Sequence, residues 1–250
     1  MQEHDSTLPK PLVEVGGNPI LWHVMKIFSH WGYRDFVLCV GCKKQAFYDY
    51  FTRYRALHSP YTVRFGKRTE IQFHGAVEER GWEVTVVDTG VDTMTGARIA
   101  RVSEFLDGTF LVTYADGLAN INLEGLLQFH REHGGCATVT AVRPPGRFGI
   151  MQLVQPDRSS RVNSFFEKPA TGTELINGGF FVFEKRFISE YLRPDANCIL
   201  EREPLEQCAR DRQLFAYAHT GSWQCMDTPM DWMKINAAWE NGNAPWKMWK

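Results

Sequence analysis

The sequence lacks an excess of charge of either sign. Its 28 Lys and Arg residues are balanced by 29 Asp and Glu residues, which leaves a formal net charge of -1. Proteins that bind nucleic acid or anionic membranes through their overall charge carry a basic excess. We therefore expect neither a nucleic acid nor a membrane as partner, and we expect any ligand to be recognised locally.

Long hydrophobic runs are also lacking. No apolar stretch approaches the roughly 18 residues that a membrane helix needs, and the start, MQEHDSTLPK, is polar rather than signal-like. There is no low-complexity stretch and no internal repeat. We therefore expect a cytoplasmic protein with one continuous domain over residues 1–250, and 44% hydrophobic residues are enough to form its core.

The six cysteines have no repeated spacing. Cys39 and Cys42 form a C-x-x-C pattern that could serve redox or zinc chemistry, but no second pair completes four ligands. Buried reduced thiols are the simpler interpretation. His130, His133 and Cys136 could likewise suggest a metal cluster, although the charged residues between the histidines favour an exposed helix face.

Apolar strands alternate with helical patterns over the first half of the chain. We expect helices over residues 19–31, 43–57, 93–105 and 121–133, and strands over 34–40, 61–65, 70–73, 82–87, 109–114 and 137–143. This alternation is typical of a mostly parallel sheet that is covered on both faces.

The second half is less regular. Residues 151–154 and 162–166 alternate as antiparallel strands do, residues 175–183 and 214–218 form two further strands, and residues 230–240 form a closing helix. The sequence therefore predicts an α/β fold whose second half is partly antiparallel and faces a sugar or another ligand.

Two carboxylates lie where such folds bind ligands, just beyond apolar strands. Asp116 follows the run 110–115, and Asp227 precedes a helix that Pro229 could open. Mg²⁺ is typically held by one or two carboxylates together with substrate phosphates. The structural alternatives are an Asp-Gly turn for Asp116 and a helix N-cap for Asp227.

Two lysines are restrained by prolines. Lys10 lies between Pro9 and Pro11, and Lys168 precedes Pro169 at the end of a strand. Either lysine could neutralise a phosphate, or it could be an ordinary surface lysine.

Hydroxyl groups stand at the start of the helical pattern in the segment DTMTGAR, residues 92–98. Free N–H groups at a helix start suit phosphate oxygens or a base edge, although capping explains the threonines equally well. Capping does not explain Gly96 and Arg98.

A resemblance that extends from Leu8 to Lys250 connects these signals. The segments that carry it include KPLVEVGGNPILWHVMKIFSHWGYRDFVLCVG, VTVVDTGVDTMTGARIARV, FLVTYADG, FFEKP, INGGFFVFE, EREPLE and GSWQCMDTPMD. With these segments in this order, the sequence resembles the glucose-1-phosphate cytidylyltransferases of the sugar-phosphate nucleotidylyltransferase superfamily.

The resemblance implies a Rossmann-like nucleotide-diphospho-sugar transferase fold with a mixed, mostly parallel sheet. It places nucleotide binding in residues 1–145 and sugar binding in residues 146–250. The implied reaction converts CTP and α-D-glucose 1-phosphate into CDP-glucose and pyrophosphate with the help of Mg²⁺. Members of the family are generally oligomeric, so we expect a homo-oligomer, with Trp239, Trp246 and Trp249 packed between subunits.

The resemblance also assigns roles to residues. Lys10, Asp116 and Asp227 match catalytic positions, and the two carboxylates match the metal ligands. The remaining matches bind the nucleotide (Lys10, Thr93, Gly96, Arg98 and Ala115) or line the sugar-phosphate pocket (Glu167, Lys168, Asn177 and Gly178).

The chain departs from the family in three places. It lacks the first strand and the glycine-rich turn, of the kind AVILAGGLGTRL, that precede the KPKP-like segment. Ala115 replaces a glycine, and Asn120 stands where an acidic residue often follows. Because the missing amides and arginine would stabilise the phosphates, and losing one such donor costs about a hundredfold or more in rate, we expect little or no activity.

Three hypotheses follow from this combination. The chain is a cytidylyltransferase whose coding start lies further upstream, a non-catalytic paralogue that binds sugar nucleotides, or a related enzyme that uses another base or sugar. The presence of Lys10, Asp116, Lys168 and Asp227 together favours the first hypothesis.

Overall fold

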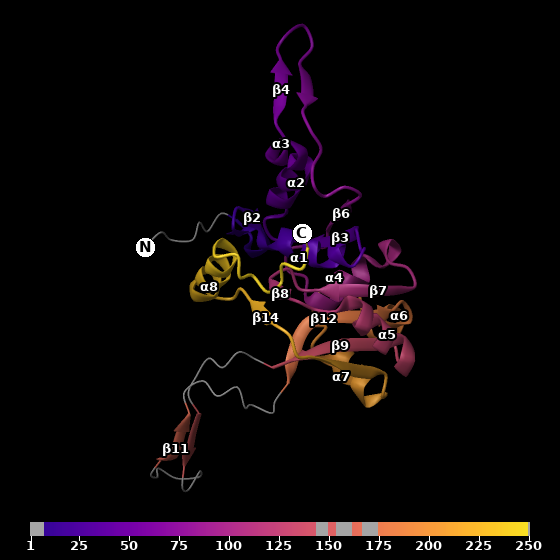
Figure 1. Cartoon of the computed structure of the whole chain (residues 1–250). Coiled ribbons are helices and arrows are strands. Elements are labelled where there is room, and N and C mark those ends of the chain that lie inside the picture. The colour runs from indigo at the N-terminus through magenta and orange to yellow at the C-terminus, as the bar shows by residue number, and fades with distance from the viewer. Residues whose placement is uncertain (1–7, 144–149, 154–161, 167–174, 250) are drawn as a thin grey trace.

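The computed structural model describes residues 8–143, 150–153, 162–166 and 175–249, which form an α/β fold (Figure 1). Its largest sheet has the order β13-β9-β12-β7, formed by Leu214–His219, Ala137–Val142, Ile176–Glu184 and Thr109–Thr113. β12 is antiparallel to β7 and to β9, whereas β13 is parallel to β9. Three strands therefore run one way and β12 runs the other, which confirms the mixed sheet.

A second sheet joins β3, Asp35–Val40, and β6, Glu83–Asp88, in parallel. Within the described ranges no strand pairs with the remaining edge of β3 or of β7. A cavity of about 660 Å³ lies along both strands and against helix α1, Ile20–His30. Among the described residues the two sheets are thus separate, and the cavity lies between them.

The other elements are helices, 3-10 turns and short strand pairs. The helices are α2 (Lys44–Thr52), α3 (Tyr54–His58), α4 (Thr95–Arg101), α5 (Leu123–His133), α6 (Arg186–Tyr191), α7 (Glu203–Arg210) and α8 (Pro229–Glu240), with 3-10 turns η1 (Lys10–Leu12) and η2 (Ser103–Phe105). Short antiparallel pairs join β1 (Glu14–Val15) to β2 (Asn18–Pro19), β4 (Tyr61–Arg64) to β5 (Glu70–Phe73), β8 (Gly117–Ala119) to β14 (Trp223–Cys225), and β10 (Ile150–Leu153) to β11 (Val162–Phe166). No described helix is long and apolar enough to cross a bilayer.

Helix α1 forms the centre of the main core. Its apolar residues recur at steps of three and four, so Ile20, Val24 and Ile27 lie on one buried face. The helix begins directly after Pro19, whose fixed φ suits a helix start, and the chain turns at Gly32, where φ is +92°.

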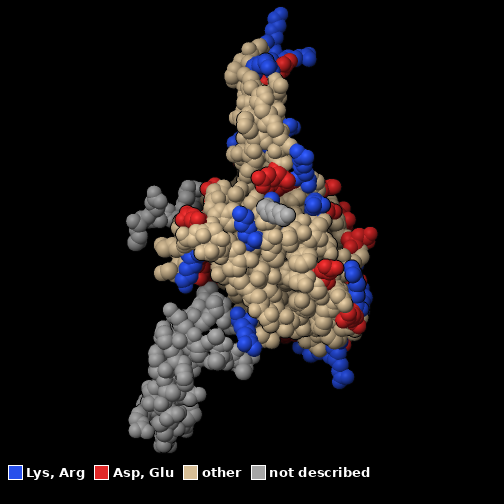
Figure 2. Space-filling view, in the orientation of Figure 1, with Lys and Arg blue, Asp and Glu red and all other residues tan. Residues whose placement is uncertain are grey.

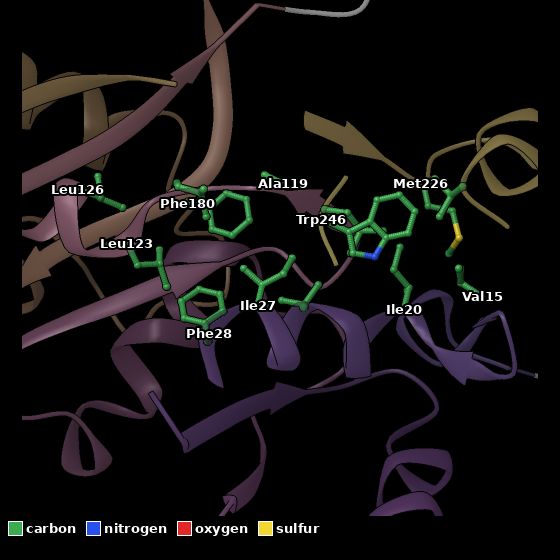
Figure 3. Packing of buried hydrophobic residues seen from close by; sticks show 14 of the residues in the cluster. Val15, Ile20, Ile27, Phe28, Ala119, Leu123, Leu126, Phe180, Met226 and Trp246 are labelled. Carbon is green, nitrogen blue, oxygen red and sulfur yellow. The ribbon is translucent and has the colours of Figure 1, made fainter. Parts of the chain in front are cut away.

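The C-terminal tryptophans pack onto this helix. Trp246 is 1% exposed and lies in the same cluster as Ile20 and Met226 (Figure 3). The rings of Trp239 and Trp249 lie 4.5 Å and 6.4 Å from the ring of His23. The expectation that these tryptophans pack between subunits is wrong for Trp246, because its indole is already buried within its own chain.

The expected exposed face around His130 is also wrong. His130 is 1% exposed because it follows Leu126 and Leu127 on the inward side of α5. Its ring contacts Thr138 Oγ1 at 2.7 Å and Glu184 Oε1 at 3.1 Å. Among the described residues no cluster of three metal-binding side chains occurs, and all six cysteines are free thiols.

His23 on α1 is buried and held as a neutral ring. Its Nε2 donates to the Val15 carbonyl at 2.9 Å, and its Nδ1 accepts from Trp246 Nε1 at 3.4 Å. Burial lowers the pKa of His23 to about 4, and the hydrogen bond to Val15 only partly opposes this shift. Protonating the ring would remove the acceptor that faces Trp246.

This depressed pKa predicts a pH dependence of stability. Because the unfolded chain binds the His23 proton with a pKa near 6.5, the stabilisation is present above that pH. It is lost as the pH falls from 6.5 to about 4, at about 1.4 kcal/mol of unfolding free energy per pH unit. Urea unfolding at several pH values should show this slope, and His23→Gln should reduce it. His30→Gln, an exposed change on the same helix, should leave the slope intact; an unaltered slope in His23→Gln would contradict the assignment.

Candidate active site

One ammonium group lies between two carboxylates. Lys10, which begins η1, places its Nζ 2.6 Å from Asp116 Oδ2 and 2.8 Å from Asp227 Oδ1. Burial lowers the pKa of Lys10, but the hydrogen bonds and charges of the two aspartates outweigh that effect and raise it. Three residues that are widely separated in the sequence thus form one charged cluster.

The short pair of β8 and β14 brings the two aspartates together. Asp116 lies in the turn that follows β7, and β8 begins at the next residue. Gly117 is the partner of Cys225 in the register, and the Met226 N–H donates to the Asp116 carbonyl at 3.0 Å. The two readings of Asp116 are therefore compatible, since it is both part of a turn and part of the cluster.

Asp227 is not the cap of the following helix. Thr228 caps α8: its hydroxyl accepts from the Asp231 N–H at 3.2 Å, and the Asp231 carboxylate accepts from the Thr228 N–H at 2.9 Å. The N-cap interpretation of Asp227 is therefore wrong by one residue. Its carboxylate faces Lys10 instead of the helix end.

Thr93 and Gly96, at the start of α4, make contacts within the fold. Thr93 is buried, and its hydroxyl accepts from Arg101 Nη1 at 2.8 Å. A Cβ at Gly96 would approach the Cys198 sulfur to 2.8 Å, so this glycine allows the loop around residue 198 to pack against α4. These contacts supply a structural reason for both residues.

The guanidinium of Arg98 lies just beyond the carboxyl end of β3. Its Nη1 donates to Thr89 Oγ1 at 2.6 Å, and its Nη2 donates to the Val91 carbonyl at 3.4 Å. A Cβ at Gly41 would lie 2.8 Å from both of these nitrogens, so Gly41 gives the guanidinium its space beyond the end of β3.

Ala115, which was expected to bind the nucleotide, lines the cavity together with Pro11. Of the four residues expected to bind the sugar phosphate, the structure describes two. Asn177 Nδ2 donates to the Tyr114 hydroxyl at 3.2 Å, and the Gly178 carbonyl accepts from Trp223 Nε1 at 2.8 Å. Glu167 and Lys168 lie outside the described residues.

Sequence reasoning missed two residues beside this cluster, Tyr114 and Glu201. The Tyr114 hydroxyl donates to Glu201, and burial followed by this hydrogen bond raises the pKa of Tyr114. Both residues stand in segments that carried the resemblance, FLVTYADG and EREPLE. The position of Tyr114 just beyond β7 was the available signal.

The chain belongs to the nucleotidyl transferase family, whose pattern matches residues 5–241. It is 42% identical over 252 residues to the glucose-1-phosphate cytidylyltransferase of Salmonella typhimurium, a match that covers 100% of this chain and 95% of that protein. It is 27% identical to the mannose-1-phosphate guanyltransferase of Gibberella zeae, over 91% of this chain and 57% of the relative.

Solved structures have the same fold. HddC from Yersinia pseudotuberculosis complexed with GMP-PN superposes with a TM-score of 0.66 at 18% identity, covering 96% of this chain and 93% of that one. At this identity the likeness concerns the fold, which agrees with the Rossmann-like architecture expected from the sequence.

The capping box before α8 yields a prediction for stability. Thr228→Ala removes the hydroxyl that satisfies a free N–H at the helix start, so the free energy of unfolding should fall by about 1 kcal/mol. Chemical denaturation measures this difference. Thr62→Ala, on an exposed strand that caps no helix, is the matched control and should change stability by less; an equal loss in both variants would contradict the capping role.

Proposed function

We propose that this protein transfers the cytidylyl group of CTP to α-D-glucose 1-phosphate, giving CDP-glucose and pyrophosphate. The observation that carries the proposal is the convergence of Lys10, Asp116 and Asp227 at the carboxyl end of β7. The 42% identity to a glucose-1-phosphate cytidylyltransferase over the whole chain supports the choice of base and sugar.

The proposed reaction is a displacement at phosphorus. An oxygen of the sugar phosphate forms a bond to the α-phosphorus of CTP, while the bond between that phosphorus and the oxygen bridging to the β-phosphate breaks. Pyrophosphate leaves with the bonding electron pair. Because charge is spread over phosphate oxygens throughout, the protein contributes mainly by positioning and by neutralising charge. Lys10 supplies a positive charge for this purpose.

The carboxylates fit a divalent cation. Two aspartates already direct oxygens toward one ammonium group, and carboxylate oxygens are the ligands that Mg²⁺ prefers. We assign Asp116 and Asp227 as the residues that would hold Mg²⁺. When bound, the ion would neutralise phosphate charge. Lys10 contacts both carboxylates in this structure, and a cation bound to them would leave its ammonium group to contact a phosphate.

The remaining residues divide between the two substrates. We place the nucleotide in the half formed by residues 1–145, beside Arg98 and Ala115. Thr93 and Gly96 would contribute by holding the start of α4 in place. The sugar phosphate belongs with residues 146–250, beside Glu167, Lys168, Asn177 and Gly178. Asn177 supports this division because it is exposed and lies next to Tyr114, two residues before Asp116.

Pyrophosphate release tests the proposed reaction. A fusion that carries the strand and glycine-rich turn at its N-terminus, mixed with CTP, α-D-glucose 1-phosphate and Mg²⁺, should release pyrophosphate, and Asp116→Asn or Asp227→Asn in that fusion should lower the rate at least a hundredfold. Asp107→Asn changes an exposed aspartate near the opposite end of β7 and should retain the rate. Undiminished turnover in Asp116→Asn would defeat the assignment.

The same assay compares the alternatives. Faster turnover with UTP, dTTP or GTP than with CTP would identify a different base. The expectation of low activity, which rests on the absent glycine-rich turn, stays a prediction and is tested by the measured rate of this chain against that of a fusion carrying such a turn at its N-terminus.

A cytoplasmic location is part of the proposal. The sulfurs of Cys136 and Cys208 lie 3.5 Å apart in the core and remain two thiols, as proteins of a reducing compartment usually keep them. The proposed substrates are small and water-soluble and need no membrane.

We also propose that the protein is a homo-oligomer. The ribbon of β4 and β5 stands away from the body, and its tip carries basic side chains (Figures 1 and 2). Along and beside it, four large apolar residues are at least 48% exposed: Leu57, Tyr61, Phe65 and Ile71. Such a protruding apolar surface is typical of a contact with another subunit.

Solution size tests this proposal. Light scattering of the wild type should give a mass above 28.7 kDa, and Phe65→Glu with Ile71→Lys should shift it toward the monomer, because both changes place charge on the proposed contact. Met230→Lys, which changes an equally exposed apolar residue on α8, should leave the mass unchanged. A monomeric wild type would refute the proposal.

A further inference from the structure

A chain of hydrogen bonds links α4 to β12 beside the charged cluster. Thr95 Oγ1 donates to Glu201 Oε2 at 2.7 Å, and the Tyr114 hydroxyl donates to Glu201 Oε1. Asn177 Nδ2 then donates to the Tyr114 oxygen at 3.2 Å. The chain therefore ends on a residue that the resemblance places in the sugar pocket.

The carboxylate at the centre of this chain sets its direction. An ionised carboxylate can only accept hydrogen bonds, so Tyr114 must direct its proton toward Glu201. The Tyr114 oxygen is then left as an acceptor, and Asn177 must meet it with its NH₂ group. The Asn177 carbonyl oxygen points the other way and accepts from the Gly179 N–H at 2.8 Å.

The surroundings hold Tyr114 in place independently of its hydroxyl. A Cβ at Gly179 would lie 2.5 Å from Cδ2 of the Tyr114 ring, so the ring packs directly on the backbone of this glycine. The ring also meets Phe181 edge-on, with centroids 5.8 Å apart. Removing only the hydroxyl therefore breaks the hydrogen-bond chain and leaves the packing of the ring intact.

In this orientation one N–H group of the Asn177 amide can still donate a hydrogen bond. Its amide has two N–H groups, of which one reaches Tyr114, and the second has no partner among the residues that the structure describes. Asn177 is exposed at the start of β12, so this N–H is accessible to a ligand.

We propose that Glu201 is a positioning residue for the sugar phosphate, and that it acts through Tyr114 by fixing the Asn177 amide so that its second N–H donates to an oxygen of that substrate. The proposal rests on the function proposed above for this site. It adds Tyr114 and Glu201 as determinants of affinity for the sugar phosphate rather than for the nucleotide.

Kinetics of the N-terminal fusion with both substrates test the assignment. Tyr114→Phe and Glu201→Gln should each raise the KM for α-D-glucose 1-phosphate by about fivefold to tenfold, the loss expected for one hydrogen bond, while the KM for CTP stays within about twofold. Because both changes interrupt the same chain, the double variant should be no worse than either single variant. Tyr191→Phe is the matched control, since its hydroxyl donates to Asp211 at 3.1 Å and not to a member of this hydrogen-bond chain. An unchanged KM for the sugar phosphate, or an equal change for both substrates, overturns the proposal.

A binding measurement separates this inference from the reaction itself. The Asn177 side-chain amide, assigned in NMR spectra by its loss in Asn177→Asp, should shift saturably on titration with α-D-glucose 1-phosphate. The apparent Kd should rise by about fivefold to tenfold in Tyr114→Phe. A saturable shift that Tyr114→Phe weakens, together with no turnover of CTP by the N-terminal fusion, would refute the proposed transfer and support the positioning role. Absence of any shift in the wild type would refute the positioning role.

Discussion

The ammonium group of Lys10 joins two carboxylates and offsets the repulsion between their charges. Its nitrogen lies 2.6 Å from Asp116 and 2.8 Å from Asp227. All three side chains are partly exposed, so the contacts contribute little to stability. Their importance is geometric. The pairing of β8 with β14 places Asp116 and Asp227 beside each other at Lys10.

The charged cluster lies between a well-packed core and a cavity. Helix α1 and the C-terminal Trp246 share one core, so the two ends of the chain stabilise each other. Next to this core, β3 and β7 border a cavity of about 660 Å³, and in the described ranges neither strand pairs with another strand on that side. The charged cluster lies at the carboxyl end of β7, where this open region meets the better-packed half of the sheet.

Local patterns predicted most of the elements well, because their information lies within a few residues. The strand at 35–40, the helix that follows Pro19 and the strand pair at 150–153 and 162–166 were all expected within one or two residues. Errors occurred where distant contacts decide. His130 was expected to be exposed because its neighbours are charged, whereas the packing of α5 turns it inward against Thr138.

The candidate site shows the same division. Lys10, Asp116 and Asp227 were identified from proline restraint, strand ends and resemblance, but nothing local shows that one nitrogen contacts both aspartates. Glu201 was missed because it does not follow a strand and its segment contains no pattern that indicates a binding or catalytic residue. Only its contact with Tyr114, 87 residues away in the sequence, brings it to the site.

The sequence by itself determined the balanced charge, the α/β alternation and the residue types of the proposed phosphate-binding site, since composition, periodicity and turn chemistry are local properties. Tertiary structure decided which of those residues meet, that Thr228 rather than Asp227 caps α8, and that Trp246 closes the core of its own chain. Such outcomes depend on strand register and on the burial of distant side chains against one another, and both are properties of the whole fold.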